Sequence, residues 1–198
     1  MLSVARHVYH GLPVPAAARK PIRAADTFYD KVRQNDPHFE RDLKESMIHV
    51  EKIAKMFNDR GIRTTTPDTK IRPTEEQMRD FTDNGDLWVH PPCGGSPLKI
   101  ECKQRKFNFD SVQSFPYPDV MVSNCHTHDR ANPKPAFYVI TDHDVQCVLV
   151  VPVSTFEQWT RHDNVWDRFK KRYRNFYNAP KSVFISLDQA CADIAART

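Results

Sequence analysis

Gly85-Asp86-Leu87-Trp88-Val89 and, nine positions further on, Leu98-Lys99-Ile100-Glu101-Cys102-Lys103 are the stretches of this chain that decide its fold. Both are short and apolar enough to predict strands. The segment between them, 91–97, contains three prolines and two adjacent glycines, which is typical of a turn. We therefore expect a hairpin. The period of two in the second strand places Ile100 and Cys102 on one face, and Lys99, Glu101 and Lys103 on the other.

The hairpin is expected to bring two acids and a lysine together: Asp86, Glu101 and Lys103. Carboxylate oxygens are the ligands of hard divalent cations. A neighbouring ammonium can orient an attacking water or stabilise negative charge that develops on a phosphate. This set of residue types is what metal-assisted hydrolysis of a phosphodiester requires. The alternative interpretation is an exposed strand face whose charges are simply solvated.

A long amphipathic helix is predicted before the hairpin. From Phe39 onward, apolar residues recur at helical spacing, and Gly61 is typical of a helix end; the apolar positions are Leu43, Met47, Val50, Ala54 and Phe57. Glu40 and Glu51 fall at the border of the apolar stripe, from which a carboxylate can lean toward a neighbouring sheet. The alternative for Glu51 is a solvated residue on the flank of the helix.

Further elements are predicted on either side of the hairpin. Strands are expected at 62–66, 118–123, 136–141, 145–153 and 182–187, a short helix at 73–81 and a terminal helix from Leu187. The strands 136–141 and 145–153 should form a second hairpin across Asp142-His143-Asp144.

The order Asp86, then Glu101-Cys102-Lys103 fifteen positions later, resembles the PD-(D/E)XK nuclease superfamily over roughly residues 39–153. The resemblance implies an α/β (α+β) fold with a restriction-endonuclease-like core, in which helices flank a central mixed sheet. It also implies a Mg²⁺- or Mn²⁺-dependent deoxyribonuclease, most simply an endonuclease, that hydrolyses DNA phosphodiester bonds.

The same resemblance assigns roles to particular residues. Asp86, Glu101 and the carbonyl of Cys102 would hold the ion, and Lys103 would position the hydrolytic water. Glu51, rather than Glu40, would be the helix carboxylate that assists. Asp119 is a competing acid, but it follows the Glu-x-Lys pair instead of preceding it. Other readings remain open: a catalytically idle nucleic-acid-binding or structural module of this fold, or a protein–protein adaptor.

Two basic segments are predicted to contact DNA. The first continues from the strand of Lys103, and the second lies in a predicted basic-aromatic helix at about 155–178; together they comprise Gln104, Arg105, Lys106, Arg168, Lys170, Lys171, Arg172 and Arg174. Cations bind phosphates and aromatic rings stack on bases. The aromatic spacing in the second segment is that of a helical core stripe, so we expect its aromatics to be mainly buried and its cations exposed.

Length and composition favour one domain, residues 39–198, preceded by an extended proline-containing arm, residues 1–38. The net charge of +4 permits a nucleic-acid partner, duplex or branched DNA, without requiring one. An odd number of cysteines, five, favours a reducing compartment. Without an apolar run of membrane-spanning length or a targeting signal, we expect a cytoplasmic protein of a bacterium or phage-infected cell, with no membrane partner. A homodimer is compatible with the predicted activity.

Overall fold

The computed structural model describes residues 37–67, 85–167 and 171–197, with side chains from residue 44 onward, and residues 37–198 form one compact unit. The predicted arm at 1–38 lies almost wholly outside the described residues. So do the predicted helix at 73–81 and two of the predicted DNA contacts, Arg168 and Lys170.

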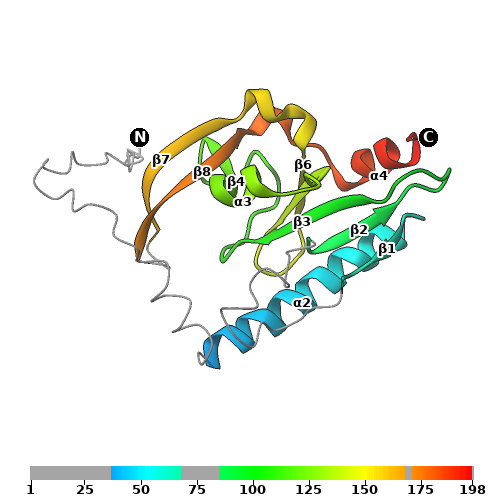
Figure 1. Ribbon diagram of the computed structural model, residues 1–198, viewed down its shortest axis with the longest axis horizontal. Coiled ribbons are helices and arrows are strands. Elements are labelled where there is room, and N and C mark those ends of the chain that lie inside the picture. Colours follow the sequence, from blue (N-terminus) through cyan, green and yellow to red (C-terminus); the bar gives the residue numbers. More distant parts are fainter. Residues whose placement is uncertain (1–36, 68–84, 168–170, 198) are drawn as a thin grey trace, which may run out of the picture. The chain divides into compact units, whose positions relative to one another are not determined.

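The described chain combines helices with two sheets (Figure 1). The larger sheet contains β1 (Arg63–Thr65), β2 (Leu87–His90), β3 (Leu98–Gln104), β5 (Phe137–Thr141) and β6 (Val148–Pro152), in the order β1-β2-β3-β5-β6. The smaller sheet contains β4 (Asp119–Asn124), β7 (Thr160–Asp167) and β8 (Arg172–Pro180), in the order β4-β8-β7. The helices are α2 (Pro37–Asn58), α3 (Cys125–Arg130) and α4 (Leu187–Ala195), with 3-10 turns η3 (Val153–Gln158) and η4 (Lys181–Val183).

The larger sheet is mixed. β3 and β5 run parallel, and the other neighbouring strands are antiparallel. A parallel pair needs a long connection, and here β4 and α3 lie within it. The predicted mixed α/β architecture with a mixed sheet and helices is confirmed.

The predicted hairpin around Asp86 and Glu101 is confirmed as the pair β2–β3, in which Leu87 lies opposite Ile100. In the turn, Gly94 and Gly95 have φ of 93° and 98°, which side chains disfavour. The predicted second hairpin is confirmed as β5–β6.

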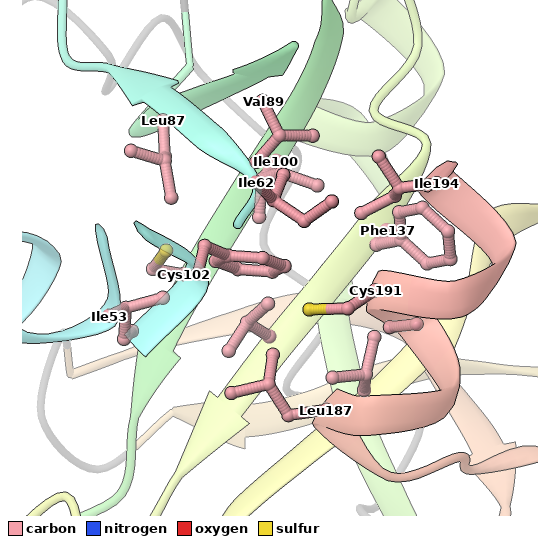
Figure 2. Close-up of a cluster of buried hydrophobic side chains, with 14 of the residues drawn as sticks. Ile53, Ile62, Leu87, Val89, Ile100, Cys102, Phe137, Leu187, Cys191 and Ile194 are labelled. Carbon is pink, nitrogen blue, oxygen red and sulfur yellow. The ribbon is translucent and has the colours of Figure 1, made fainter. Parts of the chain in front are cut away.

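One hydrophobic core lies between the larger sheet and the helices α2 and α4 (Figure 2). Ile53 of α2 and Ile194 of α4 are fully buried against Ile100 and Phe137 of the sheet. Figure 2 also shows Cys102 pointing into this core on the side of α2. The burial of these side chains is the main force that holds both helices to β3 and β5.

A second core covers the opposite face of the larger sheet. Val120 and Val122 of β4 and Ala179 of β8 pack in one cluster with Tyr138 and Ile140 of β5. The larger sheet is thus the middle layer, with helices on one side and the smaller sheet on the other. Glu101 and Lys103 alternate with Ile100 and Cys102, so they project toward the smaller sheet.

The predicted helix at about 155–178 is wrong. Residues 153–158 form a 3-10 turn, and β7 and β8 form an antiparallel hairpin that is extended by β4. Aromatic residues favour strands as well as helical core stripes, and pairing with the distant β4 decides between the two. Similarly, the predicted strand at 182–187 is reduced to one bridge between Ile185 and Val150. Among the described helices, none has the length and apolar content needed to cross a membrane.

Candidate active site

Asp86 directly precedes β2, and its carboxylate reaches across to β3. Its Oδ2 accepts a 2.7 Å hydrogen bond from the backbone N–H of Cys102. In an extended strand the N–H and C=O of one residue point to the same edge, so the Cys102 carbonyl also faces the side of Asp86. Because the Cys102 thiol is buried in the core under α2, the main chain of this residue is its contribution to the site.

Glu101 is buried, and a lysine faces each of its carboxylate oxygens. Lys103 Nζ lies 3.1 Å from Oε2 and donates a hydrogen bond to it, whereas Lys99 Nζ lies 3.5 Å from Oε1. The side chain of Lys99 is 3% exposed and that of Lys103 is 33% exposed. The charge of Asp86 also acts on Lys103, so the structure places Asp86, Glu101 and Lys103 in one cluster and adds Lys99 to them.

Gly85 makes room for this arrangement. Its φ is 87°, and a Cβ built on it would lie 2.4 Å from Cε of Lys99. Since the Lys99 ammonium is already held beside buried Glu101, its stem has little freedom to move aside. A side chain at position 85 is thus disfavoured both by the backbone conformation and by the Lys99 stem, which would have to shift.

The charge of Lys103 is stabilised by its surroundings. Burial lowers the pKa of Lys103, but the charges of Asp86 and Glu101 and the hydrogen bond to Glu101 outweigh burial and raise the pKa above its usual value. Lys103 is therefore a permanent cation at physiological pH. Such a group can orient a water or neutralise a developing oxyanion, and it is poorly suited to act as a general base.

Tyr138 extends the site toward the smaller sheet. It lies opposite Glu101 in the parallel β3–β5 register, and its hydroxyl is 2.9 Å from Nδ1 of His128. Burial raises the pKa of Tyr138 to about 12, and the negative charge of Glu101 acts in the same direction. His128 stacks on Phe156, with 4.7 Å between ring centroids, and burial lowers its pKa. Both groups are neutral at pH 7.

Neither Tyr138 nor His128 was among the residues predicted for this site. The alternation in 136–141 identifies Tyr138 as facing one side of its strand, but only the pairing of β3 with β5 places it beside Glu101. That pairing is not visible in the sequence.

The helix carboxylate is placed differently from the other predicted site residues. Glu51 is exposed and lines a groove between α2 and the β1 segment, with Ala54, Lys55, Asn58 and Thr64–Thr66 as the other lining residues. None of these belongs to the cluster around Glu101. Instead, α2 directs His49 onto the sheet, where its Nε2 lies 2.8 Å from Oγ1 of Thr141. Burial lowers the pKa of His49 to about 4, and the charges of Lys52 and Lys103 contribute.

The predicted DNA contacts at the end of β3 fall into different environments. Gln104 is exposed and donates a 2.6 Å hydrogen bond to the carbonyl of His143, and Lys106 is also exposed. Arg105 is half-buried, donates to the carbonyl of Met121 in β4, and has a buried Nε without a hydrogen-bond partner among the described residues. Burial lowers the pKa of Arg105 to about 10. Arg105 therefore links β3 to the smaller sheet.

The remaining predicted contacts lie at the β7–β8 hairpin. Lys171 is exposed, and Arg172 and Arg174 are half-buried. Nη1 of Arg174 lies 3.1 Å from Oδ2 of Asp167 on the opposite strand.

Comparison with known proteins gives no relative from which a role for these residues could be transferred. No family model, curated protein or solved structure matches the chain. In the part of the chain that the structure describes, no group of three or more His, Cys, Asp or Glu side chains is placed to hold a metal ion. A cation at this site would thus depend on two carboxylates, those of Asp86 and Glu101, supplemented by main-chain oxygen.

Proposed function

We propose that the chain is a Mg²⁺- or Mn²⁺-dependent nuclease that hydrolyses DNA phosphodiester bonds. The observation that carries the proposal is the position of Asp86, which the Cys102 N–H holds at 2.7 Å beside Glu101 and Lys103. Two acids and a stabilised cation thereby converge from adjacent strands. This convergence is what the chemistry requires and what the sequence pattern alone leaves open.

The order of elements supports a restriction-endonuclease-like core. A helix is followed by three antiparallel strands and, after a crossover, by a strand parallel to the third: α2, β1, β2, β3 and β5. This is the order that the PD-(D/E)XK resemblance implies. Glu101 and Lys103 lie on β3, and Asp86 directly precedes β2. The smaller sheet is an addition to that core.

The donor chemistry fits a hard divalent cation. The carboxylates of Asp86 and Glu101 and the carbonyl of Cys102 would hold it, and all three supply oxygen. When bound, such an ion polarises a phosphate oxygen and lowers the pKa of a bound water. Lys103 would add positive charge where the phosphate and the leaving oxygen become more negative. Tyr138, beside Glu101 on β5, would limit the orientations open to that carboxylate.

One observation favours a second candidate, a nucleic-acid-binding module of the same fold that does not cleave. Lys99 and Lys103 already compensate the charge of Glu101, so an ion must compete with two ammonium groups for the same oxygens. If Lys99 and Lys103 keep the Glu101 oxygens and no cation binds, the protein can still bind DNA through its basic surface but cannot hydrolyse it.

The experiment that separates these functions combines cleavage with ion binding. Plasmid, linear duplex, single-stranded DNA and a four-way junction are incubated with the protein in Mn²⁺ or in EDTA, and Mn²⁺ binding is measured by calorimetry. If the protein is a nuclease, it cleaves at least one substrate in Mn²⁺ and none in EDTA. The variants Asp86→Asn and Lys103→Met then abolish cleavage. Lys55→Ala, which removes an exposed lysine of α2, is the matched control and should cleave normally.

If every substrate stays intact in Mn²⁺, the nuclease function is excluded, and the nucleic-acid-binding module is the function that remains. Normal cleavage by Lys103→Met would exclude the assigned role of Lys103.

A further inference from the structure

The outer part of the β7–β8 hairpin is a two-stranded ribbon. β4 pairs with β8 only from Phe176 to Pro180, whereas β7 pairs with β8 as far as Arg172. Residues 172–175 are therefore paired on one side only, and Figure 1 shows the hairpin continuing past β4. We call residues 164–167 and 171–175 the outer ribbon.

Two large aromatic side chains are exposed on the outer ribbon. Trp166 is 53% exposed and Tyr173 is 57% exposed. They are direct cross-strand partners, with ring centroids 5.1 Å apart and ring planes at 63°. The expectation that the aromatics of this segment are mainly buried is wrong for this pair, although it holds for Phe176, which is 8% exposed.

This exposure is unusual for aromatic residues of such size, because each ring presents apolar area to water without stabilising the fold. The cross-strand contact accounts for only part of either ring. Val165, next to Trp166, is also 40% exposed, but the alternation of strand side chains places it on the opposite face of the ribbon, so Trp166 and Tyr173 form the aromatic surface by themselves.

The described residues of the β7–β8 hairpin carry a positive net charge. The hairpin carries Arg161, Lys171, Arg172 and Arg174 against two acids, Asp163 and Asp167. Each acid lies in an ion pair with an arginine of the hairpin, at 2.8 Å and 3.1 Å. An excess of positive charge beside exposed rings disfavours a basic or neutral protein partner and is complementary to a polyanion.

We propose that the outer ribbon is a binding site for unpaired nucleotides, with Trp166 and Tyr173 stacking on bases and the positive charges of Lys171 and Arg172 attracting the phosphates. In a duplex the base faces are already stacked on one another, so aromatic rings gain most from bases that are unpaired. Binding by the outer ribbon does not require cleavage, but the inference that the bound strand is cleaved rests on the proposed function. It assigns the nuclease to DNA with single-stranded regions, such as branched or tailed molecules, in preference to uniform duplex.

Binding is tested in EDTA, where hydrolysis does not interfere. Fluorescence anisotropy of a labelled 15-nucleotide thymidine strand and of a duplex of equal length reports affinity. Trp166→Ala and Tyr173→Ala should each weaken single-strand binding roughly tenfold, with a smaller effect on the duplex. Trp166→Phe should restore most of the affinity because it retains a ring.

Tyr117→Ala is the matched control, since Tyr117 is an aromatic of similar exposure, 44%, outside the hairpin. It should bind as the wild type does. Circular dichroism of each variant establishes that the sheets are intact, and Trp166→Phe keeps the test decisive if an alanine variant does not fold.

The proposal would be overturned if Tyr117→Ala and Trp166→Ala lost single-strand affinity equally. It would also be overturned if the ribbon variants lost equal affinity for single strand and duplex, or lost none. A wild type that binds no single strand would overturn it as well. The proposed nuclease can fail independently, because a protein that cleaves nothing can still show the ribbon-dependent binding.

Discussion

Asp86 and Cys102 are joined across the β2–β3 hairpin, since the carboxylate of the first accepts the backbone N–H of the second at 2.7 Å. The bond lies just beyond the last main-chain pairing of the hairpin, Leu87 with Ile100. Asp86 therefore continues the ladder with its side chain. This hydrogen bond thus extends the hairpin and also fixes the position of the Asp86 carboxylate, a proposed cation ligand.

Asp86→Ala should lower the free energy of unfolding by about 1–2 kcal/mol, because a partly buried N–H loses a charged acceptor. Urea denaturation at pH 7 measures the effect. Asp188→Ala is the control, as Asp188 is 79% exposed and ion-paired with Arg60, and should change stability by less than about 0.5 kcal/mol. Equal stabilities of the two variants would mean that the Asp86 bond contributes nothing to folding.

Lys99→Met should bind Mn²⁺ more tightly than the wild type. The substitution removes an ammonium 3.5 Å from Oε1 of Glu101 and keeps an unbranched stem to pack over Gly85. Removing one like charge from a partly screened site corresponds to about tenfold in affinity. Calorimetric titration measures it, with Lys55→Met as control. Weaker binding by Lys99→Met would instead make Lys99 a support for the geometry of Glu101.

Tyr138→Phe should destabilise the protein by about 1–2 kcal/mol, since Nδ1 of buried His128 loses its hydrogen-bond partner. Tyr117→Phe, at an exposed ring, provides the comparison and should be neutral. Thermal and urea unfolding report the difference. A Tyr138→Phe protein as stable as the wild type would show that water replaces the hydroxyl.

The protein should lose stability in acid partly through His49. Its pKa is lowered from 6.5 to about 4 in the folded state, so below pH 6.5 the unfolded chain binds the proton more readily. The stabilisation is complete above pH 6.5 and is lost as the pH falls toward 4, by about 3 kcal/mol at pH 4.

His49→Gln should flatten this part of the stability profile relative to that of the wild type. Urea unfolding at intervals between pH 7 and pH 4 measures the slope. Parallel profiles for the wild type and His49→Gln would assign the acid sensitivity to other groups.

The elements that the sequence predicted correctly are those whose signals are local. The α2 stripe of Val50 and Phe57 and the β2–β3 turn at Gly94 each depend on residues close in the chain. The parallel pairing of β3 with β5 connects segments that the whole of β4 and α3 separate, and no residue pattern encodes it directly. For that reason Tyr138 was not recognised beside Glu101.

The site residues that belong to one hairpin could be predicted. Those of α2 could not, because they depend on which side of the helix contacts the sheet. A helical wheel puts Glu51 at the border of the apolar stripe but does not say which neighbour that border meets, and the structure gives the sheet contact to His49. In the β7–β8 hairpin, the positions of Trp166, Tyr173 and Phe176 fit a period of 3.6 as well as they fit paired strands. Pairing with β4 settled the matter.

Gly85 has no side chain to take part in chemistry, yet its backbone angle and the Lys99 stem lying over it would strain any other residue at this position. In a saturation-mutagenesis screen scored by enzymatic output, this position should therefore be as intolerant as those of the acids themselves. A map of tolerated substitutions would then mark Gly85 alongside Asp86 and Glu101, although Gly85 contributes only its backbone conformation.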